Sequence, residues 1–299
     1  MKFWEEVDTT NKYKKLFEHN LERFPKRIDE TGNIVDDTSM IGRLGFLPSS
    51  LWKPDPTITK ELKKIINDTA QVRPSLNSNR SDRRHGVNDG KASVFNPHLT
   101  QMIISAYCPL EGKIYDPFGG GGTRGYMATK MGHKYLGVEI REEEVDRIKG
   151  EMKNWGIEFD MVLGDSAEYK PDGTFNFALT CPPYYDLELY SNMEEDLSNA
   201  ASYDEFLGMY RKVIQNVYDC LEPNSFAVFV VGNFRDETGE LVHFNGDTIR
   251  IGKEVGFILW DEIIWQGASN VALTRCGKFE VNRKSVRMHE YVVILKKVS

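Results

Sequence analysis

From about residue 91 to the C-terminus, short apolar segments alternate with segments of helical periodicity. Most of the apolar segments are rich in β-branched or aromatic residues, and they cover residues 113–118, 134–140, 159–165, 176–181, 225–232, 258–265 and 289–296. A strand that is apolar along nearly its whole length belongs in a sheet that is covered on both faces. The alternation therefore predicts an α/β fold with a Rossmann-like, doubly wound parallel sheet, which binds ligands at the carboxyl ends of its strands.

Three helices can be placed between these strands. The clearest covers residues 203–221, where one apolar stripe contains Phe206, Tyr210, Val213, Ile214, Val217 and Leu221. Ser202 and Glu205 form a predicted capping box at the start of this helix. The other two helices cover residues 123–131 and 247–255, and each is followed by a glycine that favours a helix end.

Residues 1–90 differ from the rest of the chain because they lack strong strand signals. They are rich in charged and turn-forming residues, and one short helix is expected at residues 57–69. Residues 73–91 form a predicted basic loop, whose arginines are Arg73, Arg80, Arg83 and Arg84. We therefore expect an N-terminal extension over residues 1–90 and an α/β domain over residues 91–299.

Composition and patterning exclude several classes of protein. No apolar run approaches the ~18–20 residues that span a membrane, and the first residues lack the apolar stretch of a signal peptide. The four cysteines form no CxxC pair and the six histidines have no metal-ligand spacing, so we expect neither disulfides nor a bound metal. The net charge of −7 still permits binding to nucleic acid, which needs only a local basic patch.

A glycine-rich loop at residues 116–123 (DPFGGGGT) follows the first predicted strand and opens a helix. Its glycines allow the backbone to turn tightly and to approach a ligand. Glu139 ends the second strand, where its carboxylate can accept hydrogen bonds from both hydroxyls of a ribose. Asp165 ends the third strand, where it can accept a hydrogen bond from the amino group of adenine. Each feature by itself is compatible with an ordinary loop or turn, but Asp116, Glu139 and Asp165 at the ends of consecutive strands predict one adenosine pocket.

The glycine-rich loop does not match a phosphate-binding loop. The Gly-Lys-[Ser/Thr] ending is missing, and Asp116 would repel a phosphate. A carboxylate beside the loop instead suits the cationic amino group of a methionine moiety. The sequence therefore favours S-adenosylmethionine over a dinucleotide as the cofactor.

A second loop at residues 180–185 (TCPPYY) follows the fourth strand directly. Pro182 and Pro183 fix the chain and leave no backbone donors of their own, so the Cys181 and Pro182 carbonyls can be held toward the pocket. The ring of Tyr184 offers a face for a planar base, although the loop by itself is equally compatible with a strand-terminating turn and a core tyrosine. Carbonyl acceptors beside a stacking ring suit an exocyclic amino group that attacks a methyl sulfonium, because alignment supplies most of the rate of such a reaction. The base has to leave the duplex to reach such a pocket.

These two loops resemble the motifs of the DNA amino-methyltransferases. Residues 116–123 resemble the Asp-Pro-Phe-x-Gly-x-Gly-Thr cofactor motif of that family, and residues 180–184 resemble its [Asp/Asn/Ser]-Pro-Pro-[Tyr/Phe/Trp] catalytic motif. Residues 93–99 resemble the family's segment that touches the methionine end of the cofactor. The resemblance covers roughly residues 91–299 and implies a seven-stranded sheet whose last two strands form an antiparallel hairpin. Residues 181–199 resemble a subgroup of phage and prophage DNA modification methylases.

The resemblance implies a site-specific DNA methyltransferase that moves a methyl group from S-adenosylmethionine to N6 of adenine or N4 of cytosine, without a metal. The implied base-binding residues are Cys181, Pro182, Pro183 and Tyr184. The implied cofactor-binding residues are Phe95, Asn96, Asp116, Pro117, Phe118, Gly119, Gly121, Thr123, Glu139, Asp165 and Ser166. The short interval between the two motifs leaves no room for a recognition domain, so we expect small target-recognition loops near residues 233–246 and 266–289.

Two residues depart from the family pattern. Arg124 replaces a common second threonine, and Cys181 stands where the family has Asp, Asn or Ser to accept a hydrogen bond from the target amino group. A thiol is a weak acceptor, so the choice between adenine and cytosine stays open. Three alternatives remain, namely a non-catalytic module that binds cofactor and DNA, a methyltransferase of RNA, and methylation of a pyrimidine carbon through a Cys181 thiolate.

The expected partner is double-stranded DNA with its target base turned out of the helix. We expect contacts from Tyr185, from the arginines of the basic loop, and from a second basic group in the last connection of the chain. This second group contains Arg275, Lys278, Arg283, Lys284 and Arg287. The acidic-polar stretch 186–202 is expected to close over the base. We predict no membrane partner, expect the cytoplasm of a bacterium or phage-infected cell, and leave the oligomeric state open, a homodimer included.

Overall fold

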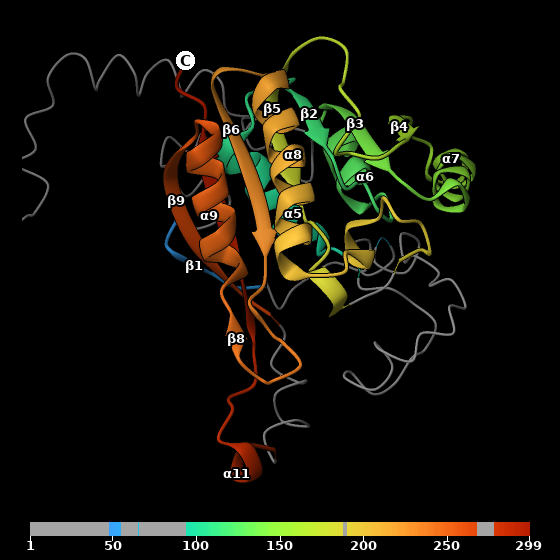
Figure 1. Ribbon diagram of the computed structural model, residues 1–299. Helices are drawn as coiled ribbons and strands as arrows, with labels where there is room; N and C mark the ends of the chain where they lie inside the picture. Colours follow the sequence, from blue (N-terminus) through green and yellow to red (C-terminus); the bar gives the residue numbers. More distant parts are fainter. Residues whose placement is uncertain (1–47, 55–64, 66–93, 188–189, 268–277) are drawn as a thin grey trace, which may run out of the picture.

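An eight-stranded sheet forms the centre of the protein (Figure 1). The computed structural model describes residues 48–54, 65, 94–187, 190–267 and 278–299. The strands of the central sheet are β1 (Leu51–Trp52), β2 (Lys113–Asp116), β3 (Lys134–Glu139), β4 (Asp160–Leu163), β5 (Phe175–Thr180), β6 (Leu221–Val231), β9 (Ile258–Gln266) and β10 (His289–Lys296). Their order across the sheet is β1-β9-β10-β6-β5-β2-β3-β4.

The direction of one strand decides which residues meet at the functional edge of this sheet. Strands β2 to β6 run parallel to one another, whereas β10 is antiparallel to both of its neighbours, β6 and β9. The pairing of Tyr291 with Val231 places the first residues of β10 beside the end of β6. The carboxyl ends of the parallel strands and the amino end of β10 therefore lie at the same edge.

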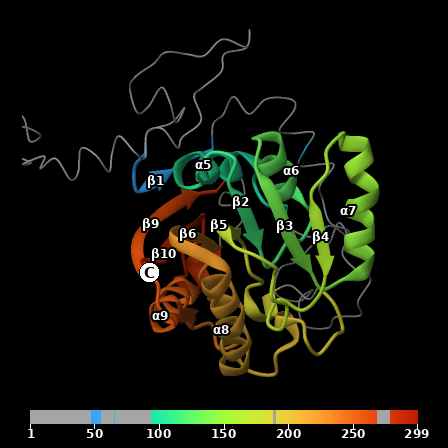
Figure 2. The ribbon, with the colours of Figure 1, turned by 90° about the horizontal axis from the view of Figure 1, so that it is seen from above.

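Helices cover both faces of the sheet (Figure 2). On one face lie α5 (Pro97–Tyr107), α6 (Thr123–Lys130) and α7 (Glu142–Trp155), and on the other lie α8 (Tyr203–Cys220) and α9 (Phe244–Val255). Each face has its own apolar core. Leu99, Ile103 and Ile148 are almost fully buried on the α5–α7 face, and Phe206 and Phe244 are fully buried on the α8–α9 face. Burial of this kind on both sides explains why the central strands are apolar throughout.

Local sequence signals set the starts of the helices that border the edge. The Asn96 side chain caps α5 by accepting hydrogen bonds from two amides of its first turn, at 2.9 and 3.2 Å. Ser202 caps α8 by accepting from the Glu205 amide at 3.1 Å, while the Glu205 carboxylate accepts from the Ala201 amide at 2.7 Å. The cap of α6 is Gly122, whose φ of 82° lies in the left-handed region that favours glycine. The glycine-rich loop therefore passes into α6 without a side-chain cap.

A small extension projects beyond the edge where β6 ends. It contains the hairpin of β7 (Phe234–Arg235) and β8 (Leu241–Val242) and the short helix α11 (Lys278–Asn282), which Figure 1 shows below the sheet. Lys284 Nζ donates a hydrogen bond to the Gly239 carbonyl at 2.9 Å, so the two connections contact each other. Within the described ranges, no helix combines the length and the apolar character that crossing a bilayer requires.

The predicted fold class is confirmed, and so are all seven expected strands and the antiparallel arrangement of the last two. The sheet gains β1, which pairs with β9 in parallel and is too short to give a strand pattern in the sequence. The predicted first residues of one strand and one helix were wrong. Strand β6 begins at Leu221 because the chain passes directly from α8 into the sheet, and α9 begins at Phe244 because this ring is fully buried in the core.

Some predictions concern residues outside the described ranges. Of the predicted helix at residues 57–69, only Ile65 is described, and it is helical and buried. The basic loop at residues 73–91 lies outside the described residues. The division of the chain into an extension over residues 1–90 and a domain over residues 91–299 stays a prediction.

We predict that two glycine-to-alanine substitutions in helices will have opposite effects on the free energy of unfolding. A Cβ at Gly125 in α6 would lie 2.5 Å from the buried ring of Phe159, so Gly125→Ala should lower this free energy by about 1–3 kcal/mol. A Cβ at Gly150 in α7 meets nothing within 4 Å, so Gly150→Ala should raise it by about 0.5–1 kcal/mol through helix propensity. Urea titration followed by circular dichroism measures both values. Equal effects of the two substitutions would contradict the close packing of α6 against Phe159.

Candidate functional site

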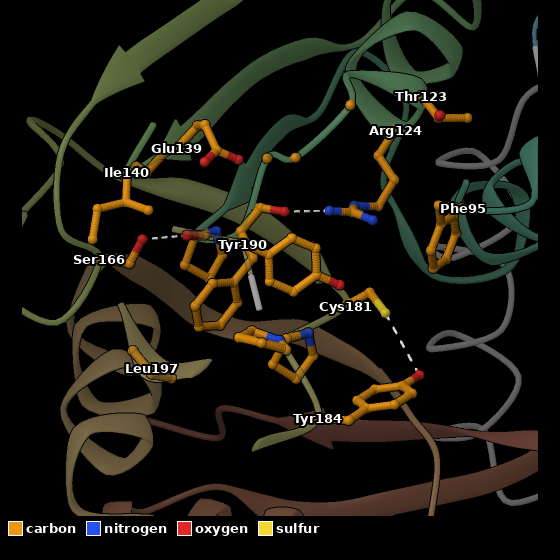
Figure 3. Close-up of a pocket in the computed structure, with 18 of the residues that line it drawn as sticks. Phe95, Thr123, Arg124, Glu139, Ile140, Ser166, Cys181, Tyr184, Tyr190 and Leu197 are labelled. Atoms are coloured by element: carbon orange, nitrogen blue, oxygen red, sulfur yellow. Dashed lines mark hydrogen bonds between the residues drawn. The ribbon is translucent and has the colours of Figure 1, made fainter. Parts of the chain in front are cut away.

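A cavity of about 550 Å³ opens at the edge where the parallel strands end (Figure 3). Its walls come from the loops after β2, β3, β4 and β5, from the start of α5 and from the start of β10. In Figure 3, Glu139, Ile140 and Ser166 lie at one side of the view, and Cys181 and Tyr184 lie at the other. The predicted site residues that line the cavity are Phe95, Asn96, Pro117, Phe118, Gly119, Gly121, Thr123, Glu139, Asp165, Ser166, Cys181, Pro182, Pro183 and Tyr184.

Asp116 is the predicted cofactor residue that does not line the cavity. Its carboxylate is fully buried and accepts four hydrogen bonds, from the Phe118 amide at 3.0 Å, Thr180 Oγ1 at 2.7 Å, Tyr135 Oη at 2.6 Å and Arg124 Nε at 2.6 Å. The expectation that this carboxylate faces the cationic amino group of a methionine moiety is therefore wrong. Its oxygens are already occupied, and it instead connects the glycine-rich loop to the end of β5.

Arg124 is a site residue to which the sequence assigned no role. Its guanidinium forms the buried ion pair with Asp116, donates a hydrogen bond to the Phe118 carbonyl, and lies 4.8 Å from the centre of the Phe95 ring. Although burial by itself would lower the pKa of this guanidinium, the Asp116 carboxylate raises it above the ordinary arginine value. Arg124 therefore stays charged and fixes both the loop and the Phe95 ring at the cavity wall. The sequence signal that could have pointed to Arg124 is that it replaces a threonine of the family pattern.

The two acids that follow β3 and β4 keep an oxygen for a ligand. Glu139 Oε1 accepts hydrogen bonds from the Arg141 amide at 3.0 Å and from Arg141 Nε at 3.2 Å, whereas no described residue donates to Oε2. Asp165 Oδ1 accepts from the Ala167 amide at 2.8 Å, and its Oδ2 likewise accepts nothing from the described part of the chain. Burial raises the pKa of both carboxyls, and Arg141 opposes this shift at Glu139.

Ser166 and Asn96 have structural partners as well as places at the cavity wall. Ser166 Oγ donates a hydrogen bond to the Pro117 carbonyl and thereby ties the loop after β4 to the glycine-rich loop. Asn96 caps α5, which places Phe95 at the cavity beside Arg124. These contacts show how the predicted cofactor residues are held in position relative to one another.

The double-proline turn presents a rigid wall to the same cavity. It follows Thr180, the last residue of β5, whose hydroxyl is bound to Asp116. Tyr184 Oη lies 3.7 Å from Cys181 Sγ and donates a hydrogen bond to Glu290 Oε1 at 2.8 Å. The Tyr184 ring also packs edge-on against Phe244, with 6.0 Å between the ring centres. The turn is therefore anchored at both ends.

Burial, followed by the negative charge of Glu290, raises the pKa of the Cys181 thiol to about 12. A thiol with such a pKa is almost entirely protonated near neutral pH, and it is therefore a poor nucleophile. Burial also raises the pKa of the Tyr184 hydroxyl well above its ordinary value. Neither group supplies a negative charge to the cavity.

The predicted site missed several cavity residues, among them Glu290, Tyr190 and Arg141. Glu290, on β10, could have been found from the antiparallel direction of the last strand, which places its first residues at the functional edge. Tyr190 lines the cavity, and Arg141 lies 5.8 Å from the centre of its ring. The stretch 186–202 was expected to close over the base. Its described part contributes Leu187, Tyr190, Glu195, Asp196 and Leu197 to the cavity wall.

The predicted nucleic-acid contacts separate into three groups. Tyr185 is half-buried, and its ring packs 5.6 Å from Tyr203 and 5.8 Å from Phe206, so it contributes to the apolar core instead of presenting a free face. Arg283 and Arg287 are exposed on the extension, and Lys284 is bound to the Gly239 carbonyl. The backbone of Lys278 belongs to α11. The residues that lie outside the described ranges are Arg73, Arg80, Arg83, Arg84 and Arg275.

Over the described ranges, no group of three or more His, Cys, Asp or Glu side chains is arranged to hold a metal ion.

Comparison with known proteins supports the family that the two loops resemble. The family model described as DNA methylase, for N6 and N4 methyltransferases, matches residues 4–150, which include the glycine-rich loop and end before the double-proline turn. The type II beta methyltransferase M.BslI of a Bacillus species is 27% identical over 173 residues, which are 52% of this chain and 18% of that protein. The chain is a relative of the DNA amino-methyltransferases.

Two further proteins are similar to this chain. The type II methyltransferase M.ScaI of Streptomyces caespitosus is 37% identical over 59 residues, which are 20% of this chain and 19% of that protein. A methyltransferase from Pyrococcus furiosus superposes with a TM-score of 0.48 at 15% identity, covering 73% of this chain and 93% of that one. The matched segments span less than one fifth of the length of either curated relative. The family resemblance is confirmed, whereas the phage subgroup stays a prediction.

We predict that Cys181 in the folded protein reacts slowly with iodoacetamide at pH 8. Its raised pKa leaves little thiolate, so alkylation should be on the order of tenfold slower, or more, than for the same cysteine in urea. Mass spectrometry of the peptide that contains Cys181 measures both rates. Equal rates in the folded and unfolded chain would contradict the protonated thiol and would revive covalent catalysis through this residue.

Proposed function

We propose that the protein is a site-specific DNA methyltransferase that transfers a methyl group from S-adenosylmethionine to the exocyclic amino group of adenine or cytosine. One observation carries this proposal. The acids after β3 and β4 and the double-proline turn after β5 line the same cavity, so a cofactor and a target base would meet inside it. The family match supports the same activity.

The cavity suits S-adenosylmethionine in the chemistry of its groups. Glu139 Oε2 is available to the ribose hydroxyls, and Asp165 Oδ2 is available to the adenine amino group. The methionine end would lie near Phe95, Asn96 and the glycine-rich loop, which line the cavity on the side of Arg124. When bound, the cofactor supplies an electrophilic methyl group.

The chain itself contributes alignment. The Cys181 and Pro182 carbonyls lie in a turn that two prolines make rigid, and they can accept hydrogen bonds from an amino group. The Tyr184 ring, held by Phe244 and Glu290, offers a face on which the base can stack. Since the nucleophile is weak, holding it in line with the methyl group supplies much of the rate.

The protonated thiol of Cys181 weighs against the alternative of methylation at a pyrimidine carbon, which needs a thiolate. Measuring methyl transfer to DNA and to RNA distinguishes the proposal from the alternatives of RNA as substrate and of a non-catalytic binding module. Within our proposal the target base is turned out of duplex DNA, the protein acts in the cytoplasm of a bacterial or phage-infected cell, and the choice between adenine and cytosine stays open.

The extension beyond β6 is the proposed surface for target recognition. The hairpin β7–β8 and the connection around α11 belong to the two regions in which we expected recognition loops, and they contact each other through Lys284 and Gly239. Arg283 and Arg287 are exposed in the connection between α11 and β10. Exposed arginines on a projecting loop suit contacts to phosphates and groove edges.

We predict that two substitutions separate base binding from cofactor binding. Tyr184→Ala should lower methyl transfer to mixed-sequence duplex DNA by about 10- to 100-fold through loss of stacking, while calorimetry should find the affinity for S-adenosylhomocysteine nearly unchanged. Glu139→Ala should weaken that affinity by about tenfold, since two charge-assisted hydrogen bonds are lost. Radiolabel transfer and nucleoside mass spectrometry measure the product and identify the base.

The matched control is Glu143→Ala, at an exposed position in the first turn of α7, which should behave as the wild type. Transfer to RNA but not to DNA would favour the RNA alternative. A folded wild-type protein that binds S-adenosylmethionine and transfers no methyl group to either nucleic acid would leave only the binding-module alternative.

We also predict that the extension contributes to DNA affinity. Arg283→Ala combined with Arg287→Ala should weaken binding several-fold and should lower the slope of log K against log salt by about 1–2, because up to two phosphate contacts are lost. Fluorescence anisotropy over a series of salt concentrations measures both quantities. Lys153→Ala, at an exposed position on the distant helix α7, should change neither. An unchanged slope in the double variant would place the DNA surface elsewhere.

A further inference from the structure

The first position of the double-proline turn lacks an effective side-chain acceptor for an amino group. Cys181 occupies it, and a thiol is a weak hydrogen-bond acceptor. Its raised pKa keeps it protonated, so it does not compensate through a charge. An amino group that enters the cavity therefore needs a stronger acceptor from another part of the chain.

Glu290 brings a carboxyl group to this position from a distant part of the sequence. In the sheet, β6 lies between β5, which leads to Cys181, and β10, which carries Glu290. The Tyr184 side chain crosses the end of β6, where Gly232 makes room, because a Cβ there would lie 3.1 Å from the Tyr184 ring. Tyr184 Oη then donates to Glu290 Oε1 at 2.8 Å and lies 3.7 Å from Cys181 Sγ. Cys181, Tyr184 and Glu290 form one contiguous group at the cavity wall.

Glu290 is a partly buried residue of the cavity wall, and its carboxyl group has few partners. Oε1 accepts one hydrogen bond, from Tyr184, whereas no described residue donates to Oε2 and none of the described ion pairs includes Glu290. Burial raises the pKa of this carboxyl, and the Tyr184 hydroxyl opposes that shift. A carboxyl group without a cation costs free energy when it is removed from water. Packing alone gives no reason for a glutamate at this position.

We propose that Glu290 is the acceptor that holds the exocyclic amino group of the target base, in place of the side chain that Cys181 does not provide. This inference rests on the proposed methyl transfer. Glu290 Oε2 would accept one N–H of the amino group and so direct the nitrogen lone pair away from the carboxylate, toward the methyl group.

The nitrogen lone pair forms the new N–C bond, the C–S bond breaks, and its electron pair remains on sulfur. The methylated nitrogen carries one proton too many, which passes to the Glu290 carboxylate and from there to water. Because positive charge develops on nitrogen during the reaction, the hydrogen bond to Glu290 is stronger in the transition state than in the bound substrate. Its removal should therefore lower kcat more than it raises KM.

The test uses Glu290→Gln in the full chain. We expect kcat for methyl transfer to mixed-sequence duplex DNA to fall by about 10- to 100-fold, because a hydrogen bond to a charged acceptor is lost. The KM for DNA and the calorimetric affinity for S-adenosylmethionine should each change by less than about threefold. The matched control is Glu262→Gln on β9, whose carboxylate also accepts one side-chain hydrogen bond, from Asn245 at 2.8 Å, and does not line the cavity. This control should retain the wild-type kcat.

Rescue distinguishes a catalytic role from a structural one. In the Glu290→Gln background, Cys181→Asn restores an acceptor at the position where the family has one, and it should recover about tenfold of the lost kcat. Glu290→Asp is the second variant. It keeps the charge but withdraws the carboxylate by one methylene group, and it should also lower kcat with little effect on thermal stability.

The outcomes separate the inference from the proposed function. A wild-type kcat in Glu290→Gln overturns the inference, and so does a loss that Cys181→Asn leaves unchanged while the melting temperature falls. If the wild-type chain transfers no methyl group, the proposed function fails first. If it does transfer one and Glu290→Gln does so equally well, only the inference about Glu290 fails.

Discussion

The buried carboxylate of Asp116 holds the two functional loops in register. It accepts the Phe118 amide from the glycine-rich loop and the Thr180 hydroxyl from the end of β5, which leads into the double-proline turn. The Arg124 guanidinium balances its charge and binds the Phe118 carbonyl as well. Removing one partner of a buried ion pair strongly destabilises the fold, because it leaves a buried charge without a counter-charge. The geometry of both loops therefore depends on this pair, although Asp116 itself does not reach the cavity.

The reversed direction of β10 gives the site its second organising feature. In a sheet of parallel strands only the loops after the strands reach the functional edge. Because β10 is antiparallel to β6, the start of this strand reaches the edge too, and it brings Glu290 beside the Tyr184 hydroxyl. The same edge carries the extension of β7, β8 and α11, so the proposed base pocket and recognition surface lie close together.

Much of the site could be predicted because its residues lie next to one another in the chain. Fourteen of the expected cofactor and base residues line one cavity. Nine of them belong to the motifs at residues 116–123 and 180–185, and the other five are Phe95, Asn96, Glu139, Asp165 and Ser166. The errors arose where a side chain turns to an unexpected neighbour. Asp116 faces Arg124, Thr180 and Tyr135 inside the protein, and Tyr185 packs against Tyr203 and Phe206 in the core. Short-range sequence patterns do not reveal such contacts, because the partners lie far apart in the chain.

The sequence by itself determined the fold class, the seven main strands and the positions of the two loops, because hydrophobic periodicity and the special backbone preferences of glycine and proline act over a few residues. Only the tertiary structure decided that Asp116 is buried away from the cavity and that Glu290 lines it. Asp116 and Glu290 are 174 positions apart in the chain, and their roles follow from strand order and strand direction. Those properties depend on how the whole sheet assembles, and so the acid in the motif became structural while an acid outside every motif reached the cavity.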